Sequence, residues 1–379
     1  MSAVTVREVA NKRDLARFID LPYLLYKGDI NFVPPLRMEV AELLNPAKNP
    51  WYEHARSALF IAERDGRVVG RISAQVDQLV LEHMGAGTGQ WGFLDLENDP
   101  AIGTALFDAA EGWLRAQGMT RSLGPFSLSI WDEPGLLIEG FYQPPTVMMG
   151  HAPPHTRAHV EARGYVKAKD LLTYELSIDI VFPRAVRRVI EGGEKNPRLL
   201  VRDTVMKDYD AESARILDML NDAWSGNWGF TPLTPAESLY AGKKMKKVVN
   251  GDLVRVAELD GVPVAFMFTL PDLNEVTKGF GGKLFPFNFI KLLAAIRKPR
   301  PYSIRVPLMG VRKEFQGTRN ASLLAFMMIE TTRRIASTKY GAKRAEIGWI
   351  LEDNLPMRSI AEAIDSRVNK RYRIYERVL

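Results

Sequence analysis

A loop near position 316 combines small and basic residues in a way that could hold a phosphorylated ligand. It follows an apolar strand pattern that ends at Val311 and precedes an apolar helical pattern that begins near Ala321. The N-terminus of a helix offers backbone N–H groups without helical partners and the positive end of the helix dipole, and both stabilise phosphate. The residues of this candidate anion site are Gly310, Val311, Arg312, Gln316, Gly317, Thr318, Arg319, Asn320 and Ala321.

The composition of the 379-residue chain limits the chemistry that can accompany this loop. The sequence contains no cysteine, which excludes disulfides, thiolate metal clusters and a cysteine nucleophile. Histidines recur every four residues from His151 to His159, but two prolines between them prevent one helix from presenting all three, so we expect no metal site. The formal net charge of +6 suits anionic small molecules or a membrane surface and does not by itself indicate nucleic acid.

Two copies of one pattern organise the chain. The segment from Ala62 to Val69 recurs 195 positions later, from Ala257 to Val264, and each copy has an Asp-Gly dipeptide between apolar runs. Asp-Gly in this setting predicts a β-hairpin with a tight turn. Val6-Arg7 recurs as Val201-Arg202 at the same offset. The two halves of the chain are therefore expected to be homologous.

Each half continues with the same order of expected elements. The predicted strands are 90–96, 121–124, 303–311 and 344–351, and the predicted helices are 102–117 and 321–339. This order predicts an α+β fold of two tandem domains, each with a central mixed β-sheet flanked by helices. The expected boundaries are a first domain at residues 1–177, a connector at 178–197 and a second domain at 198–379.

The loop of the first half that corresponds to the candidate anion site is acidic. It reads Asp95-Leu96-Glu97-Asn98-Asp99-Pro100. A carboxylate about 5 Å from a diphosphate charge costs on the order of 3 kcal/mol at an effective dielectric constant of about 20, whereas a helix dipole returns only about 0.3 to 1 kcal/mol. We therefore expect only the second half to bind a phosphorylated ligand.

The candidate anion site resembles the acyl-CoA loop of the GNAT acyltransferase superfamily. That loop has the pattern Gln/Arg-x-x-Gly-x-Gly/Ala, and this chain has Gln316 and Ala321 at its first and last positions, with Arg319 in place of a glycine. The chain as a whole is similar to the tandem GNAT proteins of the group that contains the bacterial ceramide synthases. The segments that carry this second resemblance are Gly124-Pro125, Gly135-Leu136-Leu137, Gly140-Phe141, Pro144-Pro145, 350–357 and 370–376. The resemblance implies two GNAT-like domains, a degenerate first one and a second one that binds acyl-CoA as co-substrate.

The resemblance also implies roles for residues near the end of the second domain. In GNAT enzymes an asparagine at this place contacts the cofactor, and Asn354 stands there. The usual helix tyrosine that protonates the leaving thiolate is missing, which leaves Tyr372 as the nearest candidate acid. The acceptor amine must lose a proton before it attacks the thioester. Glu352 and Asp353 are the first candidates for the base, with Glu346 as a third.

A basic and aromatic insertion at 278–300 interrupts the second domain. Phenylalanine, leucine and isoleucine are interleaved there with lysine and arginine, which suits a helix in a membrane interface or a lid over an acyl chain. A core or dimer-contact helix fits the same composition. A groove lined in this way favours long acyl groups, because each buried methylene contributes about 0.8 kcal/mol.

Three functional hypotheses follow from these interpretations. The first is an acyl-CoA-dependent N-acyltransferase that transfers a long acyl group to a lipid-like amine, such as a sphingoid base in bacterial ceramide synthesis. The second is an N-acetyltransferase for a small polar amine or an amino acid, and the third is a GNAT-like binding protein without catalysis. The sequence shows no secretory signal and no apolar run long enough to span a bilayer, which predicts a cytoplasmic location with peripheral contact at the inner face of the membrane.

Overall fold

The computed structural model describes residues 2–379, which divide into two compact units. Unit 1 contains the residues up to Leu171 together with Thr277–Asn288 and Lys370–Leu379. Unit 2 contains Leu172–Val276 and Phe289–Asn369. Strands β7 (Val166–Ser177) and β13 (Arg367–Val378) each contribute residues to both units.

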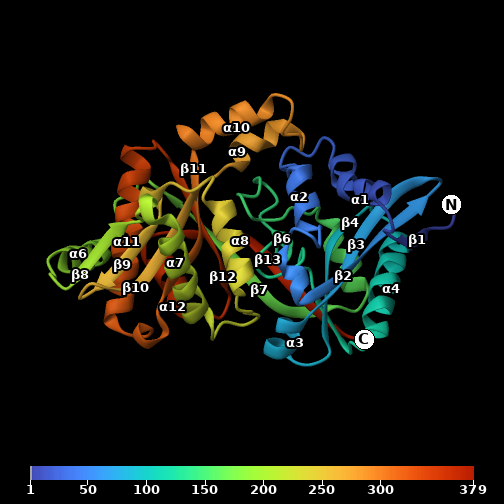
Figure 1. Cartoon of the computed structure of the whole chain (residues 1–379), viewed down its shortest axis with the longest axis horizontal. Coiled ribbons are helices and arrows are strands. Elements are labelled where there is room, and N and C mark those ends of the chain that lie inside the picture. The colour runs from blue at the N-terminus through green and yellow to red at the C-terminus, as the bar shows by residue number, and fades with distance from the viewer. Residues whose placement is uncertain (1) are drawn as a thin grey trace. The chain divides into compact units, whose positions relative to one another are not determined.

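Unit 1 is built on a mixed sheet with the order β1-β2-β3-β4-β5-β13, in which β6 also pairs with β13. Strands β4 and β5 are parallel, and the neighbouring pairs are antiparallel. Helix α4 lies beside the strands of this sheet (Figure 1). Its apolar face, including Leu106, Ala110 and Leu114, is buried in the core of the unit. The elements are β1 (Thr5–Glu8), α1 (Lys12–Leu25), α2 (Arg37–Leu43), η1 (Pro50–Glu53), β2 (Ala55–Arg64), β3 (Arg67–Asp77), α3 (Gln78–Met84), β4 (Thr88–Leu96), α4 (Pro100–Ala116), β5 (Arg121–Gly124), β6 (Leu136–Glu139), α5 (His155–Ala162) and η4 (Lys278–Phe280).

Unit 2 repeats this plan with the strand order β7-β12-β11-β10-β9-β8. Strands β11 and β12 are parallel, whereas β8 to β11 pair in antiparallel fashion. Helix α11 buries Leu324, Met327 and Met328 in the core, and full burial of such a side chain contributes about 2 kcal/mol. The elements are α6 (Arg184–Glu194), β8 (Leu199–Asp203), η2 (Met206–Asp208), α7 (Tyr209–Trp224), α8 (Pro235–Met245), η3 (Gly251–Leu253), β9 (Arg255–Leu259), β10 (Val262–Pro271), α9 (Asn274–Thr277), α10 (Asn288–Arg297), β11 (Ser303–Val311), η5 (Lys313–Phe315), α11 (Arg319–Thr338), β12 (Arg344–Leu351) and α12 (Leu355–Ala363).

Both predicted hairpins are present, as β2–β3 and β9–β10. Their turns are Asp65-Gly66, with φ of 51° and 74°, and Asp260-Gly261, with φ of 52° and 80°. Two consecutive positive φ values are the signature of the tight hairpin turn that Asp-Gly favours. The hairpins and the mixed strand order within each unit, together with the flanking helices, confirm the predicted α+β fold.

The segment expected as a connector, 178–197, contains helix α6. Val186 and Ile190 are four residues apart on this helix, and both are buried in the core of unit 2. Gly193 lies so close to Met327 on α11 that an added Cβ atom would come within 2.4 Å of the Met327 sulfur. The sequence pattern takes Gly193 as a sign of a connector between domains. The close packing of α6 against α11 explains why a glycine occurs there.

The insertion at 278–300 is divided between the two units. Its first part belongs to unit 1, where Arg37 donates its backbone N–H to the carbonyl of Gly282 at 3.1 Å and its guanidinium to the carbonyl of Gly281 at 2.7 Å. Its second part forms helix α10, which has no buried residue. Among residues 2–379, no helix carries an apolar stretch long enough to cross a bilayer.

Glu111 on α4 is a buried anion that ties together unit 1. Its side chain is fully buried and lies 2.7 Å from Arg163 Nη2 and 2.6 Å from Arg377 Nη1. Burial alone raises the pKa of Glu111, but the two arginines outweigh burial and hold this pKa below its ordinary value of 4.5. A lowered folded-state pKa adds stability above the ordinary pKa, and that stability is lost as pH falls through the folded-state pKa.

We expect the substitution Glu111→Gln to lower the free energy of unfolding by about 3 kcal/mol at neutral pH, because two partly buried arginines lose their fully buried carboxylate partner, although Arg163 keeps Asp108 at 2.6 Å. The difference between the native protein and the variant should shrink as the pH falls through the lowered folded-state pKa of Glu111, where the native carboxylate becomes protonated. Urea unfolding at several pH values measures this difference. A difference that does not change with pH would contradict the assigned role of the charge.

Candidate functional site

Strands β11 and β12 separate halfway along their length and leave an opening in the sheet of unit 2. Their parallel pairing runs from Ser303 opposite Arg344 to Val306 opposite Ile347 and stops there. Strand β11 continues to Val311 in register with β10 on its other side. Beyond this point the carbonyls of Met309 and Val311 accept hydrogen bonds from the side chains of Trp224 at 3.0 Å and Gln316 at 2.9 Å.

The candidate anion loop begins at the far end of β11 and is braced by Gln316. The Gln316 side-chain amide donates hydrogen bonds to the carbonyl of Ala223, at the end of α7, at 2.8 Å and to the carbonyl of Val311 at 2.9 Å. Gly310 allows β11 to lie close to the end of α7, because an added Cβ atom at this position would come within 2.8 Å of the Cβ atom of Ala223. Gly310, Val311 and Gln316 therefore position the loop against α7.

The next residues present donors to solvent. Gly317 has φ of 74°, with nothing within 4 Å of the place a Cβ atom would take. The Thr318 hydroxyl caps α11 by accepting the N–H of Ala321 at 3.3 Å. Within residues 2–379 no acceptor is found for the N–H groups of Gly317, Arg319 and Asn320, and all three residues are exposed. Three open amides at the N-terminus of a helix of 20 residues are suited to phosphate oxygens.

Two cations of this loop differ in their partners. Arg312 lies 2.7 Å from Asp218 on α7, so its charge is already neutralised. Arg319 is exposed, and no carboxylate in the described part of the chain pairs with it. The guanidinium of Arg319 is therefore the one that can add a charge-assisted hydrogen bond to the open amides.

The corresponding loop of unit 1 is closed by carboxylates, as its sequence predicts. Asp99 caps α4 by accepting the N–H of Ala101 at 2.8 Å, and it also lies 2.7 Å from Arg64. The hydrogen bonds from Arg64 and from the Ala101 backbone lower the pKa of Asp99, so this residue stays ionised. Glu97 lies 3.4 Å from Arg67. The N-terminus of α4 thus already carries a negative group where that of α11 presents open amides.

The structure brings Glu352, Asp353 and Asn354 together immediately after β12. Asn354 caps α12 by accepting the N–H of Met357 at 3.2 Å. Glu352 is partly buried, with its carbonyl bonded to Arg358 at 2.8 Å, and Asp353 is exposed. Two carboxylates thus follow the strand that borders the opening, as a base for an acceptor amine requires.

Tyr372, the candidate acid, belongs to unit 1 and lies on β13. Its ring is fully buried, and its hydroxyl donates to the carbonyl of Gly150 at 3.3 Å. The neighbouring Lys370 is also buried and donates to the carbonyls of Gly140 at 2.7 Å and Gln143 at 2.5 Å. Within unit 1, both side chains hold backbone carbonyls.

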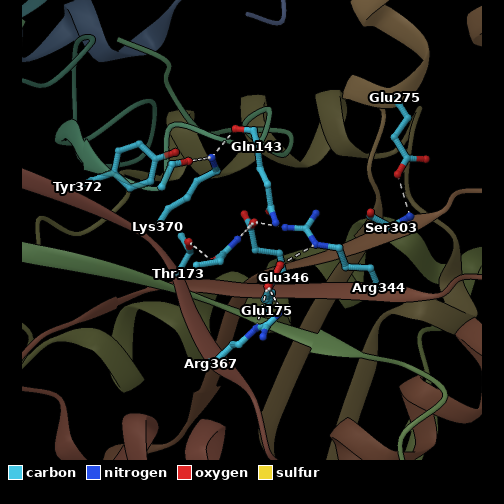
Figure 2. Close-up of polar contacts among 12 residues, drawn as sticks. Gln143, Thr173, Glu175, Glu275, Ser303, Arg344, Glu346, Arg367, Lys370 and Tyr372 are labelled. Atoms are coloured by element: carbon cyan, nitrogen blue, oxygen red, sulfur yellow. Dashed lines mark hydrogen bonds and ion pairs between the residues drawn. The ribbon is translucent and has the colours of Figure 1, made fainter. Parts of the chain in front are cut away.

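A buried polar network that the sequence analysis missed lies beside the opening. Glu346 is fully buried and accepts hydrogen bonds from Asn369 at 2.7 Å and from Arg344 at 3.0 Å (Figure 2). Asn369 in turn accepts the hydroxyl of Thr173 at 2.6 Å, and Arg344 donates to Glu175 at 3.2 Å. The sequence signal was a glutamate inside an apolar strand, but Asn369 comes from β13 and the residues that extend the network, Thr173 and Glu175, come from β7, so they leave no local pattern. The network fixes β12 at Glu346, one residue before the last residue that pairs with β11, Ile347.

An apolar cavity of about 20 Å³ lies in unit 2 between the sheet and helices α11 and α12. Val306, Met309, Ile347, Met357 and Ile360 contribute to its lining. These residues come from both strands that border the opening and from the helix that follows β12. At this volume the cavity holds about one water molecule, so an alkyl chain enters only where the lining side chains, including the flexible methionines, move aside.

Comparison with curated proteins gives two relatives of nearly the same length. The chain is 42% identical over 377 residues to the bacterial ceramide synthase of Caulobacter vibrioides (strain NA1000 / CB15N), covering 99% of this chain and 98% of that protein. It is 40% identical over 374 residues to Protein YghO of Escherichia coli (strain K12), covering 98% of this chain and 95% of that protein. No protein-family model matches the chain.

Two solved structures have the same fold over almost the whole chain. A tandem GNAT protein from the clavulanic acid biosynthesis pathway is 15% identical with a TM-score of 0.58, covering 99% of this chain and 98% of that one. A GCN5-related N-acetyltransferase from Sphaerobacter thermophilus is 12% identical with a TM-score of 0.54, covering 99% and 95%. At these identities the likeness concerns the fold alone, and it confirms the predicted tandem GNAT architecture.

Proposed function

Since the chain belongs to the acyltransferase family of the bacterial ceramide synthase, we propose that it transfers a long-chain acyl group from acyl-CoA to the nitrogen of a lipid-like amine. The observation that carries this proposal is the 42% identity to that synthase over 99% of the chain. The protein is an acyltransferase with a tandem GNAT fold. We propose the acyl donor, the acceptor and the formation of the new bond at nitrogen. The name of the relative favours a sphingoid base as the acceptor.

The second unit is proposed to hold acyl-CoA. The diphosphate accepts hydrogen bonds from the open N–H groups of Gly317, Arg319 and Asn320, and the Arg319 guanidinium adds charge. Asn354 and the separated edges of β11 and β12 then face the amide-bearing arm of the cofactor. The acidic loop around Asp99 keeps the corresponding place in unit 1 free of CoA.

The reaction then forms one bond and breaks one. The uncharged amine nitrogen attacks the thioester carbonyl carbon, the new C–N bond forms, and the C–S bond breaks to release the CoA thiolate. Glu352 or Asp353 accepts the proton that the amine gives up, and backbone amides on the free edge of β11 stabilise the developing oxyanion. The thiolate finally takes a proton from solvent or from a nearby side chain.

Support for a long acyl group comes from the apolar cavity behind the opening. Its lining of methionine and isoleucine gives an alkyl chain apolar surface to bury. Each buried methylene contributes about 0.8 kcal/mol, so four further methylenes correspond to a preference of about 200-fold over a shorter chain. The proposal includes a cytoplasmic location, with the lipid-like amine reached at the inner face of the membrane.

We expect purified protein to form an amide from a long-chain acyl-CoA and a sphingoid base, and to use acetyl-CoA about 200-fold less efficiently. Mass spectrometry of incubations with acyl-CoAs of increasing length, each with a sphingoid base or a small polar amine, measures both preferences. Turnover confined to acetyl-CoA and the small amine would support the alternative N-acetyltransferase. CoA binding without turnover of any pair would support a binding protein that has lost catalysis.

A further inference from the structure

The net positive charge of the chain resides in one segment. Residues 278–300 contain six lysines and arginines and no aspartate or glutamate. The whole chain has 51 basic and 45 acidic residues, so the remaining 356 residues carry 45 of each and are formally neutral. The cations are Lys278, Lys283, Lys291, Arg297, Lys298 and Arg300. A local excess of this size attracts an anionic surface.

Helix α10, within this segment, exposes apolar side chains. Phe289 is 38% exposed, Ile290 is 55% exposed and Leu293 is 41% exposed. On a helix of 3.6 residues per turn these three positions lie within an arc of about 100°, so they form one apolar face. Figure 1 shows α10 in orange at the margin of unit 2, apart from the strands of its sheet.

Phe285 and Phe287, just before the helix, are 63% and 72% exposed. Aromatic rings of this kind are enriched at the boundary between lipid head groups and acyl chains.

The cations of α10 and its C-terminal extension have no ion-pair partner in the described part of the chain. Within residues 2–379 no carboxylate forms an ion pair with Lys291, Arg297, Lys298 or Arg300. The ordinary solvent-exposed face of a helix differs from α10 in two ways. It carries charges of both signs, and it has no cluster of exposed phenylalanine, isoleucine and leucine. Unpaired cations beside an apolar face are the features of a helix that lies in a membrane interface.

We infer that α10 is an interfacial anchor that binds the protein to bilayers containing anionic phospholipids. The apolar face of Phe289, Ile290 and Leu293 enters the boundary of the acyl chains, and the neighbouring cations contact lipid phosphates. This inference deepens the proposed function and rests on it for its purpose, because a lipid-like amine is reached most directly from a bilayer. Binding itself can be measured without any substrate.

The test is flotation of the full-length protein with vesicles of phosphatidylcholine alone or with about 30% phosphatidylglycerol. We expect binding to the anionic vesicles that is about tenfold or more stronger than binding to the neutral ones and that weakens with salt. The variant Lys291→Gln/Arg297→Gln/Lys298→Gln/Arg300→Gln should lose this preference. The variant Phe289→Ser/Ile290→Ser/Leu293→Ser should bind weakly even at low salt.

Helix α8 and the residues after it offer a control with the same change of charge. Lys243, Lys244, Lys246 and Lys247 form a second basic cluster in unit 2, and Lys246 already pairs with Asp210 at 3.0 Å. Substituting these four lysines by glutamine changes the net charge equally and should leave vesicle binding intact. Equal losses from both fourfold variants would show a general charge effect and overturn the inference.

Insertion into the bilayer has its own readout, because the chain contains no cysteine. An environment-sensitive dye on Ile290→Cys should shift its emission to the blue with anionic vesicles, whereas the same dye on Lys243→Cys should not. No shift at position 290, or variants that alter self-association in solution in place of vesicle binding, would overturn the inference.

Turnover of short-chain, detergent-dispersed substrates separates this inference from the proposed function. The anchor variants should keep that turnover while they lose vesicle binding. Loss of turnover with intact vesicle binding would identify α10 as a lid and overturn the anchor. Vesicle binding by a wild-type protein that acylates no amine would support the anchor and contradict only the proposed function.

Discussion

Replacing Gln316 and Arg319 together by glutamate is expected to abolish measurable CoA binding. The substitution of Arg319 removes an exposed cation that has no carboxylate partner within residues 2–379, and it places a carboxylate beside the open amides of Gly317 and Asn320. A carboxylate about 5 Å from a phosphate charge costs on the order of 3 kcal/mol at an effective dielectric constant of about 20. Since two are introduced, the expected loss of affinity exceeds about 100-fold.

The two single variants separate charge from loop geometry. Arg319→Glu leaves the brace from Gln316 to Ala223 and Val311 in place, so its effect reports charge alone. Gln316→Glu replaces a donor of two hydrogen bonds by an acceptor that faces two carbonyls, so the loop should detach from α7. We expect isothermal titration with CoA to show weaker binding in both.

Unit 1 supplies a matched control for this experiment. The variant Arg67→Glu replaces an arginine by glutamate, as Arg319→Glu does. Arg67 lies 3.4 Å from Glu97, which belongs to the loop of unit 1 that corresponds to the anion site. Because that loop is not expected to hold CoA, this variant should bind CoA like the native protein. Unchanged affinity in the double variant, or a comparable loss in Arg67→Glu, would show that the diphosphate lies elsewhere.

The sequence predicted correctly those parts of the fold that depend on residues close together in the chain. An Asp-Gly dipeptide between apolar runs specifies a hairpin within a few residues, and both hairpins are present. The strand predicted at 303–311 and the strand predicted at 344–351 coincide with β11 and β12. The helix between them was expected from position 321 and begins at Arg319, because Thr318 caps it.

The sequence predicted only part of the candidate site, because the contacts of its residues come from segments far away in the chain. The sequence placed Gln316 in the loop as a ligand-binding residue, but it could not show that the side chain reaches Ala223, 93 positions earlier. The same limit hid Asn369 on β13, which donates to Glu346, and Thr173 on β7, which donates to Asn369. Acidic and basic residues inside strands are rare when buried, and each requires a partner that a single sequence does not reveal.

The buried network around Glu346 is where we expect the largest change in stability. The Glu346 carboxylate accepts from Asn369 and Arg344 in a fully buried position. Substituting Glu346 by alanine leaves a buried amide donor without its acceptor and removes one of the two carboxylates that Arg344 contacts. Breaking one side of a buried charged pair costs about 3 to 5 kcal/mol. Glu346→Gln keeps one acceptor oxygen and should cost less.

An exposed ion pair of the same unit provides the comparison. Asp179 and Lys343 lie 3.2 Å apart, with about half of each side chain exposed. Asp179→Ala should therefore cost less than about 1 kcal/mol, since exposed ion pairs contribute little. Urea unfolding followed by circular dichroism compares the two alanine variants, and hydrogen exchange reports the backbone amides of β12 directly.

If the network holds β12 at the opening, exchange in β12 should accelerate in Glu346→Ala and remain native in Asp179→Ala. The acyl-CoA loop is held by a separate set of contacts to α7, so CoA affinity should fall by less than in the loop variants. Equal stability of the two alanine variants would mean that water replaces the lost carboxylate. The network would then be a consequence of the strand arrangement and not its support.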